Sequence, residues 1–193
     1  MTRAVAVVPA AGAGERFGGD KILTPIDGTP MLERAVRSLL DGGVDAVVVV
    51  LGGEGPDLRR LLPVLADRRV SVAVNPDPSR GMLSSIQTGL AGLTGDPILV
   101  LPADMPYVRS STVAALLQSY DERAAIISPR CDGKRGHPVV IPGRHRDEIL
   151  RMPPSATLHD VIRAHAGERV DLEVTDRGIL RDVDIMADLR SKP

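Results

Sequence analysis

AVAVVPAAGAGERFGGDK, residues 4–21, begins with a short apolar run that leads directly into a glycine-rich loop. An almost continuously apolar run of this length is typical of a strand that is buried on both faces of a sheet. Glycines allow backbone N–H groups to approach a ligand closely, and Arg16 and Lys21 would neutralise a negative charge there. The stretch therefore predicts a buried first strand followed by a loop that holds phosphate.

Two familiar phosphate-binding loops do not fit this stretch. The dinucleotide-binding fingerprint G-x-G-x-x-G needs a glycine where the chain has Phe17, and an acidic residue about twenty positions further on, where we expect a helix. A Walker A loop needs lysine directly after its second glycine, whereas Asp20 separates Gly19 from Lys21. The loop therefore belongs to neither class.

Apolar runs alternate along the chain with segments of helical spacing. One helix is expected after the N-cap and first-turn pair Thr29 and Pro30, with a stop at Gly42-Gly43, and another after a Ser-Ser-Thr cap at residues 110–112. This alternation predicts an α/β fold of three α/β/α layers, with a Rossmann-like, mostly parallel sheet, in a single domain over residues 1–193. A small β-hairpin is expected around residues 131–137. The predicted strands cover residues 4–8, 46–51, 70–74, 97–101, 124–127, 138–141 and 170–174.

The composition excludes several classes of partner. The aromatic residues are Phe17, Tyr107 and Tyr120, too few to provide the stacking platforms that single-stranded nucleic acid needs. A net charge of −1 gives no overall attraction to polyanions. Cys131 is the only cysteine, which suits a reducing compartment, and the apolar run 4–11 is too short to span a bilayer. We therefore expect a cytoplasmic protein with no nucleic-acid or membrane partner.

Asp104 stands in the stretch PILVLPADMPYV, residues 97–108, three residues beyond an apolar strand. Ligands of open α/β sheets bind beyond the carboxyl ends of the strands, so we expect Asp104 to face the same crevice as the glycine loop. A carboxylate in that place could hold Mg²⁺ against phosphate oxygens. An aspartate before Met-Pro could also cap a turn, and the sequence leaves both interpretations open.

The loop pattern A-A-G-x-G-x-R-F-G-x-x-K, residues 10–21, resembles the signature of the MobA-like nucleotidyltransferases, in which this loop wraps the triphosphate of an NTP. NPDPSRGMLSSIQTGL, residues 75–90, and KRGHPVVI, residues 134–141, are similar to segments of the MocA branch of that family. MocA proteins are molybdenum cofactor cytidylyltransferases, which transfer CMP from CTP to the terminal phosphate of molybdopterin and release pyrophosphate. The resemblance spans nearly the whole chain and implies a Mg²⁺-dependent enzyme with the fold of the nucleotide-diphospho-sugar transferases.

The resemblance also implies which residues bind the nucleotide. Lys21, Arg16 and Asp104 would be catalytic, with the two cations on the triphosphate. Gly81 and Ser85 would contact the base or ribose from the start of a helix whose outward side we expect to carry Ser84, Ser85 and Thr88. The implied nucleotide-binding residues are Ala11, Gly12, Gly14, Arg16, Lys21, Gly81 and Ser85.

The second metal ligand implied by the resemblance lies near the end of the chain. Family members carry a segment like D-I-D-T-P-E-D, in which the second acidic residue helps to hold the metal; here Asp184 would share the metal with Asp104, and Asp182 is the alternative. This chain has Ile185 and Met186 where Thr-Pro is usual, which leaves the local turn undetermined.

The G-H-P loop faces the acceptor in the family, so His137 and Arg135 are expected to bind a phosphate-bearing acceptor, to which Lys134 is also suited. His145, His159 and His165 have no partner pattern in the sequence, and no Cys/His metal cluster is expected.

Three alternatives stay open at this point. The enzyme could be a guanylyltransferase of the MobA type, or it could use another acceptor phosphate. A non-catalytic nucleotide-binding module is the third, and the altered tail at residues 182–189 favours it. The expected partners are an NTP, CTP being favoured, a phosphate-bearing small molecule, and a molybdoenzyme or its chaperone.

Overall fold

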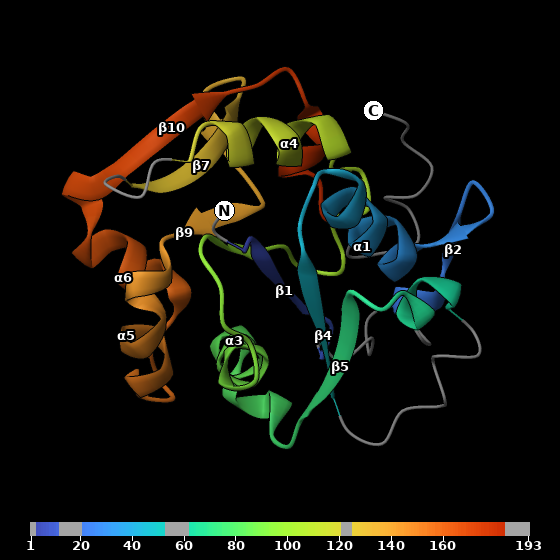
Figure 1. The fold of residues 1–193 in the computed structure, drawn as a ribbon, viewed down its shortest axis with the longest axis horizontal. Helices are drawn as coiled ribbons and strands as arrows, with labels where there is room; N and C mark the ends of the chain where they lie inside the picture. The colour runs from blue at the N-terminus through green and yellow to red at the C-terminus, as the bar shows by residue number, and fades with distance from the viewer. Residues whose placement is uncertain (1–2, 12–20, 53–61, 121–124, 184–193) are drawn as a thin grey trace.

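The structure, a computed structural model, describes residues 3–11, 21–52, 62–120 and 125–183. Its centre is a twisted sheet in the strand order β10-β7-β9-β6-β1-β4-β5 (Figure 1). The short strand β8 pairs with β7 outside this order. The strands of this sheet are β1 (Val5–Pro9), β4 (Ala46–Gly52), β5 (Val70–Asn75), β6 (Ile98–Val100), β7 (Ile126–Cys131), β8 (Lys134–Arg135), β9 (Val139–Ile141) and β10 (Arg169–Glu173).

The sheet is mostly parallel, as predicted. β1 runs parallel to both β4 and β6, β4 to β5, and β7 to β10, whereas β9 is antiparallel to its neighbours β6 and β7. Each of the seven strands expected from the sequence has its counterpart in the structure. The carboxyl ends of β1, β4, β5 and β6 therefore meet at one edge of the sheet.

Helices cover both faces of the sheet. α1 and α4 pack on one face, and α3, α5 and α6 pack on the other (Figure 1). Alternate residues of β1 point into the two cores, Ala6 and Val8 into one, Val5 and Val7 into the other, and all four are fully buried. The apolar run at the start of the chain is thus buried on both faces. The helices are α1 (Met31–Asp41), α3 (Met82–Ala91), α4 (Ser110–Gln118), α5 (Arg146–Arg151) and α6 (Leu158–Ala164); the short 3₁₀ helices are η2 (Lys21–Leu23), η3 (Pro63–Ala66), η4 (Pro78–Arg80), η5 (Gly143–His145), η6 (Ala166–Glu168) and η7 (Arg177–Leu180).

The predicted start of α1 is wrong by one residue, because Pro30 is the N-cap and not the first helical residue. Thr29 and Pro30 form the short strand β3 (Thr29–Pro30), which pairs with β2 (Pro25–Ile26) across a turn that has positive φ at Asp27 and Gly28. A two-residue turn with both φ values positive is the tight hairpin turn that matches strand twist, and it holds the pair in an extended conformation. The helix therefore begins at Met31, and it ends before Gly42 as expected.

The predicted cap of α4 is also wrong, because a distant residue does the capping. Arg109 occupies the N-cap position and makes no side-chain cap hydrogen bond. The carboxylate of Asp176, from the segment before η7, instead accepts hydrogen bonds from the Arg109 backbone N–H at 2.9 Å and from the Thr112 hydroxyl at 2.7 Å. It also accepts the Gly178 backbone N–H at 2.9 Å. Asp176 is 3% exposed and joins the end of the sheet to the start of α4.

Asp176→Ala is expected to lower the free energy of unfolding by roughly 3 kcal/mol, since three donors, two of them buried, lose their acceptor together with a helix cap. Urea denaturation measures this change. Glu173→Ala is the matched control, because Glu173 is exposed and pairs with Arg130 at the surface; its expected effect is below about 0.5 kcal/mol. Equal losses for the two variants would contradict the structural role of Asp176.

The expected hairpin is present. β7 and β8 pair antiparallel, and the turn between them consists of Asp132 and Gly133, both with positive φ. Such a turn matches the right-handed twist of the flanking strands. It carries the chain from the end of β7 back to Arg135 and His137. Over the described residues, none of the helices combines the length and the apolar character that crossing a bilayer requires.

Candidate active site

The structure brings Lys21 and Asp104 together, although 83 residues separate them in the sequence. Lys21 begins η2, directly after the glycine loop, and Asp104 follows β6 at the same edge of the sheet. The Lys21 ammonium donates to the Asp104 carboxylate over 3.1 Å, and both side chains are partly buried, with 16% and 31% exposed. The lysine and the aspartate that the sequence singled out are therefore in contact at the carboxyl edge of the sheet.

The C-terminal segment passes beside Asp104. The Val183 backbone N–H donates to the Asp104 carbonyl oxygen over 2.9 Å, and Val183 is fully buried. Asp182, the alternative metal ligand, is exposed next to this contact. Asp184, the preferred ligand, lies outside the described residues, as do Gly12, Gly14 and Arg16 of the loop.

Ala11 lies at the opening of the loop, against the end of β4. The Ala10 backbone N–H donates to the Val50 carbonyl oxygen over 2.8 Å. A Cβ atom on Gly52 would lie 3.0 Å from the Ala11 carbonyl oxygen, so a larger residue there would require the Ala11 backbone to shift by a few tenths of an ångström. Nucleotide binding by Ala11 stays a prediction.

The serines of α3 are not on its outward side, which corrects the expectation from the sequence. Ser84 and Ser85 are 6% and 3% exposed. Asn75, at the end of β5, donates its side-chain amide to both hydroxyls, over 2.8 Å to Ser84 and 3.0 Å to Ser85. The helix turns these hydroxyls toward the strand end because the amide of Asn75 is itself buried and needs acceptors. Contact of Ser85 with the nucleotide stays a prediction, and Gly81 precedes the helix with a φ of 87°.

Asn75 is a candidate functional residue to which the sequence analysis assigned no role. Its side-chain oxygen Oδ1 accepts the Asp77 backbone N–H at 3.0 Å, while its side-chain NH₂ group donates to the two serine hydroxyls. Asn75 therefore orients both the η4 turn and the start of α3. A polar residue directly after the apolar run 70–74 is the signal that could have identified it, as the apolar run before Asp104 identified that residue.

A cleft of about 600 Å³ lies between the start of α3, the β8–β9 connection and the start of α6. It brings together three of the predicted site residues, Gly81, Arg135 and His137. Its other lining residues include Arg80, Met82, His159 and Arg169. The cleft thus combines nucleotide and acceptor candidates in one space.

The walls of the cleft carry positive charge. Arg169, at the start of β10, donates to the Ser128 hydroxyl over 2.9 Å, and its Nε atom is buried with no hydrogen-bond partner among the described residues. Burial lowers the pKa of this guanidinium, and the nearby charge of Arg135 lowers it further. Two guanidinium groups this close favour an anion between or beside them. No local pattern in the sequence singled out Arg169.

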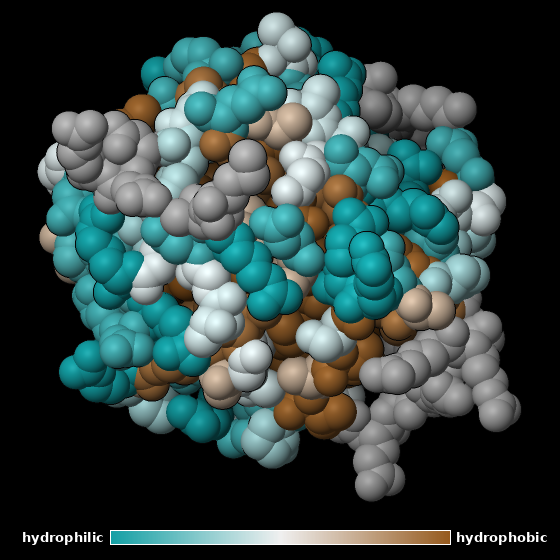
Figure 2. All heavy atoms as spheres, in the orientation of Figure 1, coloured by the Kyte–Doolittle hydropathy of each residue, from teal (hydrophilic) through white to brown (hydrophobic). Residues whose placement is uncertain are grey.

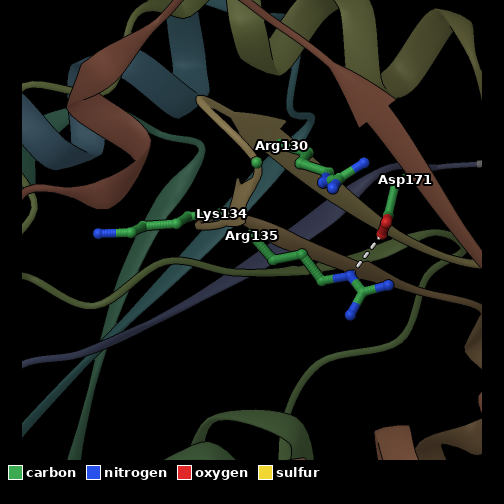
Figure 3. A pocket seen from close by; sticks show the side chains of 5 residues that line it. Arg130, Lys134, Arg135 and Asp171 are labelled. Atoms are coloured by element: carbon green, nitrogen blue, oxygen red, sulfur yellow. Dashed lines mark hydrogen bonds and ion pairs between the residues drawn. The ribbon is translucent and has the colours of Figure 1, made fainter.

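Arg135 is held by an ion pair with Asp171 of β10, at 2.6 Å between Nε and Oδ1 (Figure 3). The same view shows Lys134 pointing away from Arg135, Arg130 and Asp171. These four residues and Gly133 line a second, open hollow beside the hairpin. Arg135 therefore borders both hollows, whereas Lys134 lines only the second.

Apolar side chains border the mouth of the cleft. Figure 2 shows apolar atoms exposed between α3 and β5. Met82 of α3, which lines the cleft, and Val74 of β5 are 53% and 54% exposed. A ring system entering the cleft would find apolar contact at Met82, and the lining also offers the cations Arg80, Arg135 and Arg169.

His137 is half-buried, and its backbone N–H donates to the Ile179 carbonyl oxygen over 3.0 Å. Burial lowers the pKa of its imidazole below the ordinary value of 6.5, and the charges of Asp104 and Asp182 oppose this shift only in part. His137 therefore lies near the Lys21–Asp104 pair, and burial favours the neutral form of its imidazole.

In the metal-free protein, an NMR titration of His137 is expected to give a pKa below 6.5. The unfolded chain then binds more protons than the folded one between that pKa and 6.5, so the free energy of unfolding rises with pH across this window and falls as the pH drops. His137→Gln should flatten the dependence there. A measured pKa of 6.5 or above would contradict the assignment.

The chain matches the MobA-like NTP transferase domain over residues 6–170. It belongs to this family, and it is a nucleotidyltransferase. It is 36% identical over 175 residues to nicotine blue oxidoreductase of Paenarthrobacter nicotinovorans, covering 86% of this chain and 79% of that protein. It is 33% identical over 196 residues to 2-C-methyl-D-erythritol 4-phosphate cytidylyltransferase of Streptomyces avermitilis, covering 90% and 77%.

Solved structures show the same fold. Rv0371c of Mycobacterium tuberculosis H37Rv superposes with a TM-score of 0.79 at 24% sequence identity, covering 98% of this chain and 96% of that one. A second structure of Rv0371c is a complex with manganese. The fold expected from the sequence and the family suggested by its motifs are both confirmed.

Proposed function

We propose that this protein transfers CMP from CTP to a phosphate group of a small-molecule acceptor, with molybdopterin as the favoured acceptor, and releases pyrophosphate. The observation that carries the proposal is the Lys21–Asp104 pair at the carboxyl edge of the sheet, next to a cleft with basic walls. The cytidylyltransferase relative supports CTP as the donor, and the G-H-P loop of the cleft supports a molybdopterin acceptor.

In this reaction an oxygen of the acceptor phosphate attacks the α-phosphorus of the NTP, and the bond from that phosphorus to the bridging oxygen of pyrophosphate breaks. Negative charge grows on the non-bridging and leaving oxygens. The Lys21 ammonium, a compact point charge, would neutralise it, and Arg16 would hold the triphosphate. A phosphate nucleophile is ionised near neutral pH, so the reaction does not require a general base.

Asp104 is suited to hold Mg²⁺. Its carboxylate is partly exposed at the strand end and already pairs with a cation, the Lys21 ammonium. Val183, which follows Asp182, contacts the Asp104 backbone. A ligand set of Asp104 with Asp182 or Asp184 would consist of oxygen alone, which suits Mg²⁺ and Mn²⁺. The manganese complex of Rv0371c also supports a divalent metal in this fold. When bound, the metal would supply charge neutralisation of the phosphate oxygens.

The acceptor would occupy the 600 Å³ cleft. Arg169 and Arg135 offer guanidinium groups for its phosphate, and the neutral His137 offers a hydrogen bond close to Asp104. Met82 offers apolar contact for a ring at the mouth. In this proposal the acceptor phosphate would lie on the side of His137 that leads to the nucleotide.

The test incubates the protein with Mg²⁺, molybdopterin and each of labelled CTP, GTP, ATP and UTP, and then analyses the nucleotide product. Formation of a cytidylylated acceptor from CTP supports the proposal. A guanylylated product would assign a MobA-type enzyme. Binding of NTP with no product from any phosphate-bearing acceptor would favour a binding module. Reduction of nicotine blue by a nicotinamide reductant, the second candidate suggested by the 36% identical relative, would favour an oxidoreductase.

Two matched variants test the acceptor cleft. Arg169→Ala should raise the KM for the acceptor about tenfold with little change in the KM for NTP, because only the acceptor phosphate loses a charged partner. Lys134→Ala is the control, since Lys134 is not among the residues that line this cleft. Equal effects of the two substitutions would remove Arg169 from the acceptor site.

A further inference from the structure

Two copies of the pattern His-x-x-Glu meet at one place in the fold. His145-Arg146-Asp147-Glu148 spans the end of η5 and the start of α5, and His165-Ala166-Gly167-Glu168 follows α6 and forms η6. The two histidine rings lie 4.2 Å apart between centroids. Neither histidine stood out in the sequence, because the four side chains come together only when the two segments pack against each other.

His145, Glu148 and His165 present their ligand atoms to one point. One ligand atom each from His145, Glu148 and His165 lies within 4.8 Å of the others. Glu148 Oε2 is 3.5 Å from His145 Nδ1 and 2.8 Å from His165 Nε2. Ligand atoms at about 2.0–2.1 Å from a tetrahedral zinc ion stand about 3.3 Å apart, so small side-chain adjustments would complete the geometry.

Glu168 lies behind both rings and faces their other nitrogen atoms. Its carboxylate is 3.3 Å from His145 Nε2 and 3.6 Å from His165 Nδ1, and Arg144 holds it at 2.6 Å. Histidines that bind metals commonly donate their second ring N–H to a carboxylate, which orients the ring. His145 is 5% exposed, and its Nε2 makes no hydrogen bond within the described part of the chain.

We propose that His145, His165 and Glu148 bind Zn²⁺, with Glu168 as the carboxylate that orients the two imidazoles. Two imidazoles and one carboxylate are typical zinc ligands, whereas Mg²⁺ and Ca²⁺ prefer oxygen alone. A solvent water would complete the four ligands. The ion would join η5 and α5 to α6 and η6, and so stiffen the wall of the acceptor cleft to which Thr157 and Leu158 belong.

This site is separate from the Lys21–Asp104 pair. α5 and α6 lie on the left of Figure 1, and α1, against which η2 with Lys21 packs, lies on the right. The zinc proposal does not depend on the proposed function, because its ligands belong to a different set of residues and its test uses no nucleotide.

The test measures thermal unfolding of the untagged, metal-free protein with and without ZnCl₂. Zinc at a hundred times its dissociation constant should raise Tm by roughly 5 to 10 °C. Glu148→Gln and His165→Ala should each abolish the rise; Glu148 is 41% exposed, so its variant keeps the fold. Substitution with Co²⁺ should give the intense visible absorption of a tetrahedral ion in the wild type, and this absorption should be absent from Glu148→Gln and His165→Ala.

Two controls decide where the zinc binds. His159→Ala removes an exposed histidine of the adjacent α6 and should retain the full rise in Tm. Asp104→Asn removes the proposed catalytic carboxylate and should also retain it. An unchanged wild-type Tm, a rise that persists in both Glu148→Gln and His165→Ala, or a rise lost in Asp104→Asn would each overturn the proposal.

Discussion

Asp104→Asn is expected to lower kcat by roughly 10³-fold or more while the protein stays folded. Asparagine keeps the size of the side chain but removes the charge that would hold the divalent ion beside the triphosphate. The Asp104 side chain is 31% exposed, so water can solvate the Lys21 ammonium that loses its partner, and the cost in stability is small. Pyrophosphate release measures turnover, and thermal unfolding checks the fold.

The matched control for this substitution is Asp132→Asn, in the turn between β7 and β8, where the aspartate is exposed and pairs with Arg177. Its turnover should equal that of the wild type. If Asp104→Asn retained near-wild-type pyrophosphate release, Asp104 would have no place in the metal site, and the proposed function would lose the contact that carries it.

Lys21→Ala is expected to lower kcat/KM for the NTP by roughly 10²- to 10³-fold, the loss typical of removing one positioned charge that stabilises a transition state. Both kcat and KM should change, because the ammonium would bind the triphosphate in the ground state and neutralise charge as pyrophosphate leaves. Steady-state kinetics with varied NTP separate the two effects.

Lys21→Arg serves as the control for charge alone. Arginine keeps the positive charge but replaces a compact ammonium with a planar guanidinium, so it should restore binding better than turnover. Unchanged kinetics in Lys21→Ala would mean that the glycine-rich loop has been misinterpreted. In the double variant with Asp104→Asn, the two losses should not add, because the side chains touch.

Much of the fold followed from local patterns. The run Val5–Pro9 has nothing but apolar side chains, and a segment of that kind is stable only when both of its faces are covered, which implies helices on each side of a sheet. The boundaries were less secure: Pro30 suits the first turn of a helix, yet the tight turn at Asp27-Gly28 draws it into a strand. At that position the geometry of the neighbouring turn, and not the local helix propensity, decides the conformation of the backbone.

For the site, the sequence by itself determined which charged side chains lie at the carboxyl ends of the strands. A glycine loop ending in Lys21 and an aspartate just beyond β6 had to share an edge, because parallel strands bring their carboxyl ends together. The tertiary structure alone decided what lies around them: that Asn75 holds the serines of α3, that Arg169 reaches the cleft, and that two His-x-x-Glu segments meet. Those contacts join residues from separate segments, and no period or spacing along a chain records a contact made only when its elements pack.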